Sequence, residues 1–194
     1  SYHSSFAFPT VKLLSPIDAP DFPYKMQILN RMFVDAQYLL GLEQKLRGFS
    51  IAHSAETYFH YTQQCLNAKK RGFVGKVVVT QWENIPFNNE GIRGRKNFKK
   101  RSINEADHFI AVSRDAKTAL IAEGADEKRI TIIPPGINTN IFKPRIQKTK
   151  NNINILFVGR LEKYKGVYDV IKAFSILLND KSLKSKKIFL TMVG

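Results

Sequence analysis

The chain has 194 residues, of which 43% are hydrophobic and 24% are charged, a balance that excludes collagen-like and disordered classes. Its one cysteine, Cys65, excludes an internal disulfide framework and a cysteine-based metal cluster and fits a reducing cytoplasm. No apolar run reaches the roughly 18 residues that a membrane-spanning helix needs. The net charge of +15 favours a polyanionic partner, which is a nucleic acid, an anionic lipid surface or a phosphorylated small molecule.

Short β-branched runs alternate with longer amphipathic stretches along the whole chain. Up to the turn at Pro134-Pro135-Gly136, they predict strands at residues 11–14, 50–53, 76–80, 109–112 and 129–133 and helices at 24–46, 57–70 and 93–104. Ser113 is the expected N-cap of a further helix. Beyond the turn, they predict a strand at 153–158, a helix at 167–178 and a strand at 188–193. Such alternation favours an α/β fold with a Rossmann-like parallel sheet and flanking helices.

The polar stretch after the Pro-Pro-Gly turn is the expected domain boundary, because the strand–helix rhythm restarts behind it. We expect a first domain at residues 1–144, a linker at 145–152 and the first β-α-β unit of a second Rossmann-like domain at 153–194. About 40 residues are too few to bury a stable core. We therefore expect the chain to be an incomplete piece of a longer protein.

The segment from Gly159 to Gly166 carries the clearest chemical signal. A hydrophobic strand ends at Gly159, a short loop carries Arg160 and Lys165, and a helix is expected to begin near Gly166. Ligands of open α/β sheets bind beyond the carboxyl ends of strands, and helix N-termini there attract anions. Arg and Lys side chains add a planar fork and a mobile charge for phosphate. The segment predicts a diphosphate site, and plain surface charge is the alternative.

Three segments resemble glycosyltransferase family 4, in the order and spacing of that family. Residues 106–113 resemble its AD-x-aliphatic-aliphatic-AVS segment, and residues 130–144 resemble its I-x-V-I-P-x-G linker. The third segment joins Phe157-Val158-Gly159-Arg160-Leu161 to Lys165-Gly166-Val167 and Ala173-Phe174. The resemblance covers residues 104–194 strongly, and the part before them is compatible with it.

The resemblance implies the GT-B fold, with two facing Rossmann-like domains. It further implies a hexosyl-type transferase that moves a sugar, with retention, from a nucleotide-diphosphate sugar to a glycan or lipid-linked acceptor hydroxyl. No metal and no cofactor besides the sugar donor are implied. Gly159, Arg160 and Lys165 would bind the donor diphosphate. The family's glycine-rich loop would precede Ser1 and its E-x7-E segment would follow Gly194, so we expect this fragment alone to be inactive.

The acceptor-side candidates follow two predicted strands of the first domain. Many family members carry a histidine after the strand at 76–80, whereas this chain has Gln81, Trp82 and Glu83. We select Glu83 to orient an acceptor hydroxyl and Trp82 to stack on a sugar ring. His53 is the second catalytic candidate, although a structural role also explains it. Glu56 fits either the cleft or the first turn of the following helix.

A basic run lies between the acceptor-side strand predicted at 76–80 and the next predicted strand, at 109–112. In a family whose acceptors are often lipid-linked, it predicts peripheral contact with an anionic membrane through Arg93, Arg95, Lys96, Lys99, Lys100 and Arg101. Nucleic-acid binding is the less favoured alternative, because only Phe98 offers a stacking ring inside the run. A non-catalytic module that binds a phosphate ligand is a further alternative.

Overall fold

The computed structural model describes residues 9–34, 36–144 and 152–194, and the chain divides into two compact units, Ser1–Gly136 and Ile137–Gly194. Each unit is described by itself. Of the linker expected at 145–152, only Asn152 lies within the described residues, and it begins a strand. The boundary between the units follows the Pro-Pro-Gly turn directly.

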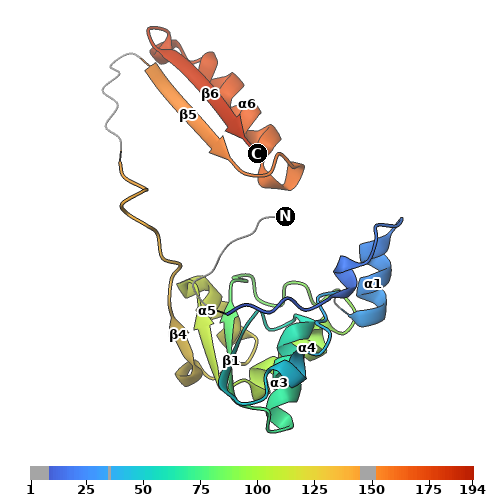
Figure 1. The fold of residues 1–194 in the computed structure, drawn as a ribbon. Coiled ribbons are helices and arrows are strands. Elements are labelled where there is room, and N and C mark those ends of the chain that lie inside the picture. The colour runs from blue at the N-terminus through green and yellow to red at the C-terminus, as the bar shows by residue number, and fades with distance from the viewer. Residues whose placement is uncertain (1–8, 35, 145–151) are drawn as a thin grey trace. The chain divides into compact units, whose positions relative to one another are not determined.

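The first unit contains a parallel sheet with the strand order β1-β2-β3-β4 (Figure 1). The strands are β1 (Phe49–Ala55), β2 (Val74–Gln81), β3 (His108–Ala111) and β4 (Ile130–Ile132). Ala52 is paired with Val77, Val79 with Phe109, and Ala111 with Ile132. The strands predicted at 50–53, 76–80, 109–112 and 129–133 are thus confirmed, as is the α/β fold class.

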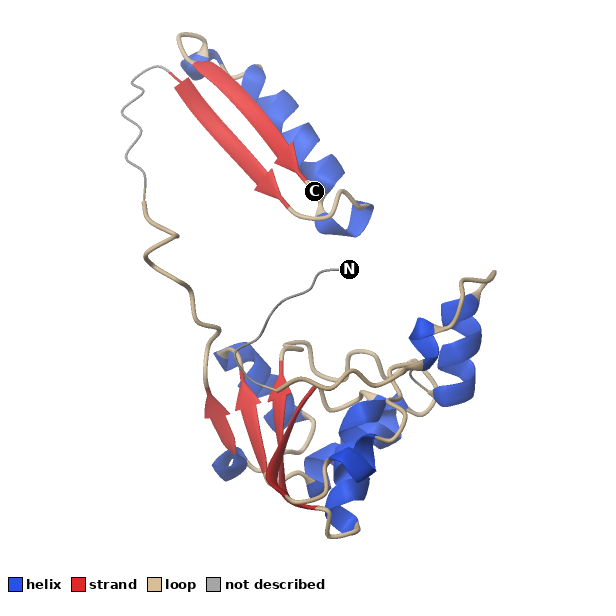
Figure 2. Cartoon of the chain, in the orientation of Figure 1, coloured by secondary structure: helices blue, strands red, loops and turns tan. Residues whose placement is uncertain are grey.

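Three helices join successive strands of this sheet, namely α3 (His60–Lys70), α4 (Arg95–Glu105) and α5 (Arg114–Ala122), with the short turn η2 (Glu127–Arg129) before β4 (Figure 2). Their buried side chains meet Val77, Val79 and Phe109 in one hydrophobic core. Successive right-handed crossovers in one direction place such helices on the same face of a sheet. The opposite face carries Ile51 and His53, which are exposed.

Cys65 lies inside this core, where burial raises the pKa of its thiol to about 11. A buried thiol of this kind is a small apolar packing residue. Ser113 caps α5 as expected, since its Oγ accepts the N–H of Ala116 at 3.1 Å.

The N-terminal part of the chain differs from the predicted pattern. The strand expected at 11–14 is absent from the described residues, and the helix expected at 24–46 is two short helices, α1 (Lys25–Phe33) and α2 (Leu42–Lys45), preceded by the turn η1 (Pro16–Asp18). The break has a tertiary cause: the side-chain amide of Gln64, on α3, accepts the N–H of Leu39 at 2.9 Å and donates to its carbonyl at 2.8 Å. This pairing holds the backbone at Leu39, between α1 and α2, in a non-helical form.

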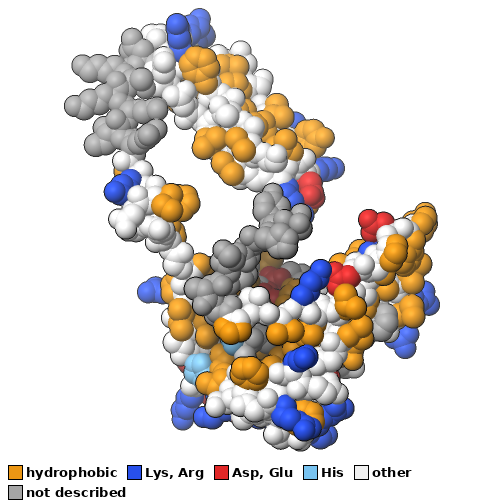
Figure 3. All heavy atoms as spheres, viewed as in Figure 1, with side chains coloured by type: hydrophobic (Ala, Val, Ile, Leu, Met, Phe, Trp, Pro, Cys, Tyr) orange, Lys and Arg blue, Asp and Glu red, His pale blue; other side chains and the backbone are white. Residues whose placement is uncertain are grey.

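The second unit is one β-α-β repeat. It runs from β5 (Asn152–Val158) through the turn η3 (Lys163–Lys165), α6 (Val167–Leu178) and the turn η4 (Lys181–Leu183) to β6 (Lys187–Val193). The two strands are parallel, and all three predicted elements are confirmed. Apolar side chains gather on the open face of this pair of strands (Figure 3), among them Leu156, Val158, Phe189 and Val193.

Candidate functional site

The carboxyl ends of all four parallel strands of the first unit meet at one edge of the sheet, where open α/β sheets bind ligands. The chain leaves β1 through Glu56, β2 through Trp82 and Glu83, and β3 through Val112 and Ser113. The candidates after β1 and β2 therefore lie on adjacent strands, as the parallel arrangement requires.

Glu83 lies at this edge, and both oxygens of its carboxylate accept hydrogen bonds from the loop that follows it. Oε1 accepts the backbone N–H groups of Asn84 and Ile85 at 3.1 and 3.0 Å. Oε2 accepts the side-chain amides of Asn88 and Asn89 at 2.5 and 3.4 Å. With four donors on two oxygens, the Glu83 carboxylate acts as the internal anchor of its own loop. This geometry favours a positioning role for Glu83 over proton transfer.

His53 lies one strand away, near the end of β1. Its Nε2 is 2.6 Å from the hydroxyl oxygen of Thr80, on β2, and its ring is exposed. Together with Ser54, Ala55 and Trp82, these two residues line an open hollow of about 310 Å³. The hollow combines an aromatic wall with hydroxyl and imidazole groups, which suits a polyhydroxylated ligand.

The loop at 82–89 presents three apolar side chains to solvent although it is held tightly. Trp82, Ile85 and Phe87 are 55%, 59% and 55% exposed. Phe87 and Asn89 have φ angles of 60° and 64°, in the left-handed region that non-glycine residues rarely occupy. Besides Glu83, Glu123 at the end of α5 anchors this loop, since its Oε1 accepts the N–H of Phe87 at 2.8 Å.

Glu56 is the site residue that the sequence pattern left unresolved. It is not in the first turn of a helix, because α3 begins only at His60. Its φ is 59° and it is 6% exposed. Its Oε1 accepts the N–H groups of Trp82 at 2.9 Å and of Glu83 at 3.2 Å. Burial raises the pKa of Glu56 to about 7, although these two hydrogen bonds act to lower it.

The basic run forms α4 as predicted, but its cations do not share one exposed face. Arg95 and Lys99 are 9% and 1% exposed and lie over the ring of Tyr58. The Nζ of Lys99 is 2.5 Å from Oε1 of Glu123, in a pair whose side chains are 2% and 3% exposed. The expected membrane contact through Arg95 and Lys99 is therefore wrong, because these cations neutralise and pack within the first unit. Arg93, Lys96 and Lys100 are exposed, and Arg101 is half-buried against Glu105.

The predicted phosphate loop of the second unit is open. Arg160 and Lys165 both lie over the ring of Tyr164, with their charged atoms 5.3 and 5.2 Å from its centroid. Arg160 is 69% exposed, and its surface contact with Glu162, at 3.4 Å, is weak. Gly166, with φ 79°, begins α6 and provides no side-chain cap. The N–H groups of the first turn of α6 and two cations thus lie in one short segment. Gly159, with a φ of 159°, directly follows β5.

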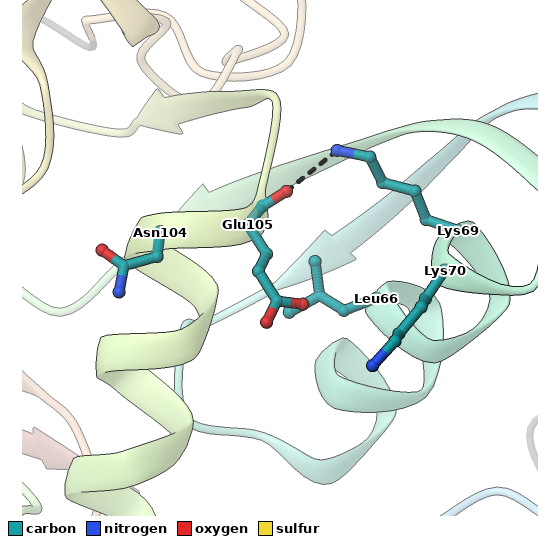
Figure 4. A pocket seen from close by; sticks show the side chains of 5 residues that line it. All are labelled: Leu66, Lys69, Lys70, Asn104 and Glu105. Atoms are coloured by element: carbon teal, nitrogen blue, oxygen red, sulfur yellow. Dashed lines mark hydrogen bonds between the residues drawn. The ribbon is translucent and has the colours of Figure 1, made fainter.

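A pocket at the amino end of the strands lies beside charged groups that bond to the protein itself (Figure 4). Lys69 donates to the carbonyl of Glu105 at 2.9 Å and to Oδ2 of Asp107 at 2.7 Å, and the same Oδ2 accepts the N–H of Val77 at 2.8 Å. Burial acts to raise the pKa of Asp107, but the bonds from Lys69 and Val77 outweigh it and hold that pKa below its ordinary value. Asp107 therefore joins α3, β2 and β3 at the end of the sheet away from the candidate site.

Glycosyltransferase Family 4 matches this sequence over residues 10–141. The chain belongs to this family. An uncharacterized glycosyltransferase of Methanocaldococcus jannaschii is 36% identical over 105 residues, which are 51% of this chain and 26% of the relative. D-inositol 3-phosphate glycosyltransferases of Paenarthrobacter aurescens and Acidothermus cellulolyticus are 29% and 30% identical over 94 and 110 residues, or 44% and 49% of this chain and 23% and 25% of each relative. These matches span about a quarter of each relative's length.

A solved lipopolysaccharide outer core galactosyltransferase in its apo form overlaps 88% of this chain and 50% of its own chain, with a TM-score of 0.48 and 12% identity. The match to Glycosyltransferase Family 4 includes the whole strand edge around Glu56 and Glu83, whereas the loop at 159–166 lies beyond it. No helix among the described residues of this family member is long and apolar enough to cross a bilayer.

Proposed function

We propose that the protein containing this chain is a retaining, metal-independent glycosyltransferase. It transfers a hexosyl-type sugar from a nucleotide-diphosphate sugar to an acceptor hydroxyl on a glycan or a lipid-linked acceptor. The observation that carries the proposal is the family match across the first unit. Its relatives include D-inositol 3-phosphate glycosyltransferases, whose name indicates a polyhydroxylated acceptor.

In this proposal, the first unit provides the acceptor side. The hollow beside Trp82 offers an aromatic surface for a sugar ring, while His53 and Thr80 provide groups for its hydroxyls. Glu83 holds the loop that carries Trp82 and acts as a positioning residue. We propose His53 as the group that contacts the reacting hydroxyl.

The second unit provides the donor side. Arg160 and Lys165 bind the donor diphosphate, and Gly159 keeps the end of β5 free of a side chain. Charge grows on the diphosphate as the sugar leaves, so fixed cations there stabilise the transition state more than the ground state. The uncapped first turn of α6 adds N–H groups of the same polarity. These groups would do the work of charge neutralisation that a metal ion does in other transferases.

The test is a donor screen on the complete protein, with nucleotide-diphosphate sugars and with glycan and lipid acceptors, in the presence of a metal chelator. We expect transfer from one donor class, with retained anomeric configuration in the product. Absence of transfer from every nucleotide sugar would refute the proposal. Inverted product or complete inhibition by the chelator would refute its mechanism.

We further propose that the complete protein binds anionic membranes peripherally through the exposed cations Arg93, Lys96 and Lys100. Each cation near an anionic surface contributes about 1 kcal/mol. Replacing the three with alanine should weaken sedimentation with anionic liposomes, and added salt should do the same. The matched control replaces three exposed lysines of the second unit, Lys181, Lys184 and Lys186. Equal loss in both variants, or equal binding to neutral liposomes, would contradict this surface.

A further inference from the structure

Glu56 has a combination of properties that packing alone does not require. It follows β1 directly, is 6% exposed, and has a φ of 59°. A left-handed conformation of a residue with a Cβ costs roughly 1–2 kcal/mol. The conformation is fixed on both sides, because the Glu56 N–H donates to the carbonyl of Thr80 at 2.8 Å and its own carbonyl accepts the Thr62 hydroxyl at 2.8 Å. The backbone thus aims this carboxylate in one direction.

The two carboxylate oxygens of Glu56 have different surroundings. Oε1 accepts the N–H groups of Trp82 and Glu83, the first two residues after β2. Oε2 is buried and accepts no hydrogen bond from the part of the chain that the structure describes. One oxygen therefore fixes the start of the loop at 82–89, while the other is a buried acceptor with no donor among the described residues.

The charges around Glu56 do not offset its burial. Glu83, on the loop after β2, repels a negative charge on Glu56, and Lys99, on α4, attracts it. Lys99 is already paired with Glu123, at the end of α5. Arg95, also on α4, lies over the ring of Tyr58, with its charge centre 5.0 Å from the ring centroid. Burial is the largest influence on the pKa of Glu56, which it raises to about 7, so the charge of this group changes near neutral pH.

We propose that Glu56 is a positioning residue whose protonation state sets the conformation of the loop at 82–89, and through it the orientation of Trp82 toward the acceptor. The deprotonated carboxylate accepts two charge-assisted hydrogen bonds and holds the loop in the conformation described above. A proton from solvent on Oε2 removes the charge, weakens both bonds and loosens the start of the loop. The role of the loop rests on the proposed acceptor side, whereas the link between Glu56 and Trp82 does not.

The first experiment follows the backbone amides of Trp82 and Glu83 in wild-type protein by NMR between pH 5 and 9. Both amide shifts should titrate together, with a midpoint at about pH 7. Flat amide shifts across this range would overturn the proposal, and no variant has to fold for this outcome.

The second experiment uses the fluorescence of Trp82, the one tryptophan in the 194 residues. Emission that is lost in Trp82→Phe comes from Trp82, and in wild type it should change with pH. This pH dependence should disappear in Glu56→Gln, because glutamine keeps an oxygen for the two N–H groups but cannot titrate. Glu43→Gln is the matched control, because Glu43 is also buried, at 8% exposure, but accepts from Gln64. An unchanged transition in Glu56→Gln, or its loss in Glu43→Gln as well, would overturn the proposal.

The third experiment measures acceptor kcat/KM against pH in the complete protein. The wild type should lose up to about tenfold per pH unit below the midpoint, and Glu56→Gln should lack this acidic limb. An acidic limb that persists in Glu56→Gln would overturn the catalytic part of the inference. If no transfer is found with any donor, the proposed function fails, while the amide and fluorescence titrations still decide the link between Glu56 and the loop.

Discussion

The two candidate sites of this chain differ in the burial of their charged side chains. At the strand edge of the first unit, Glu56, Lys99 and Glu123 are buried and bonded to the protein itself. In the loop of the second unit, the Arg160 side chain is 69% exposed, with an ion pair to Glu162 and a contact with the ring of Tyr164. Buried charges fix shape and shift their protonation, whereas exposed cations retain their attraction for an incoming anion. Variants at the first site should thus change stability, and variants at the second should change binding and turnover.

The largest effect is expected at Lys99. Lys99→Met leaves Glu123 buried without its cation, which should destabilise the fold by about 3–5 kcal/mol. Lys100→Met, one position along the same helix but exposed, should change stability by about 0.5 kcal/mol or less. Urea unfolding of both variants measures the difference. Equal effects of the two variants would show that the buried Lys99–Glu123 pair contributes no more to stability than an exposed lysine does.

The second effect concerns the exposed cations. Arg160→Ala and Lys165→Ala in the complete protein should each lower kcat/KM for the donor by roughly 10²–10³-fold, as expected for the loss of a preorganised group that stabilises developing charge. The unfolding midpoint should stay unchanged. Lys163→Ala, in the same turn as Lys165 and also exposed, is the control and should retain most of the activity. Wild-type turnover in the first two variants would contradict the diphosphate assignment.

The third effect is a dependence of stability on pH. Because the pKa of Glu56 is raised from 4.5 to about 7, the folded protein keeps a proton that the unfolded chain releases between these values. Its contribution to stability is therefore greatest below about pH 4.5, falls as pH rises to about 7, and is constant above. The free energy of unfolding of Glu56→Gln minus that of wild type should therefore be larger at pH 8 than at pH 4.5, by up to roughly 3 kcal/mol. Urea unfolding at both pH values measures this, and a pH-independent difference would contradict the buried charge.

The smallest effect compares two helix N-termini. The Ser113 side chain caps α5, so Ser113→Ala should cost about 1 kcal/mol of stability. Gly166 begins α6 without a side-chain cap and with φ 79°, so Gly166→Ala should cost about the same through backbone strain. Only Gly166→Ala should also raise the donor KM, because the first turn of α6 adjoins Lys165. A donor KM that changes equally in both variants would remove the distinction.

Several elements were readable from the sequence because local pattern and tertiary structure agree. The helix predicted at 167–178 is α6 itself, since apolar residues recur at helical spacing behind a glycine that tolerates a positive φ. Ser113 is predicted as an N-cap and is one in the structure, because its hydroxyl stands directly before an amphipathic run. The helix predicted at 24–46 failed because the amide of Gln64, on a different helix, binds the backbone of Leu39.

The sequence by itself determined the α/β class, the order of the strands and helices from β1 onward, and the loop that carries Arg160 and Lys165, because periodicity and glycine positions act locally. Only the tertiary structure decided which charges are buried. Lys99 and Lys100 are adjacent and identical in the sequence, yet one packs on Tyr58 and pairs with Glu123 while the other faces solvent. Glu56 shows the same limit: its neighbours Trp82 and Glu83 are far along the chain, and the pairing of β1 with β2 brings them together.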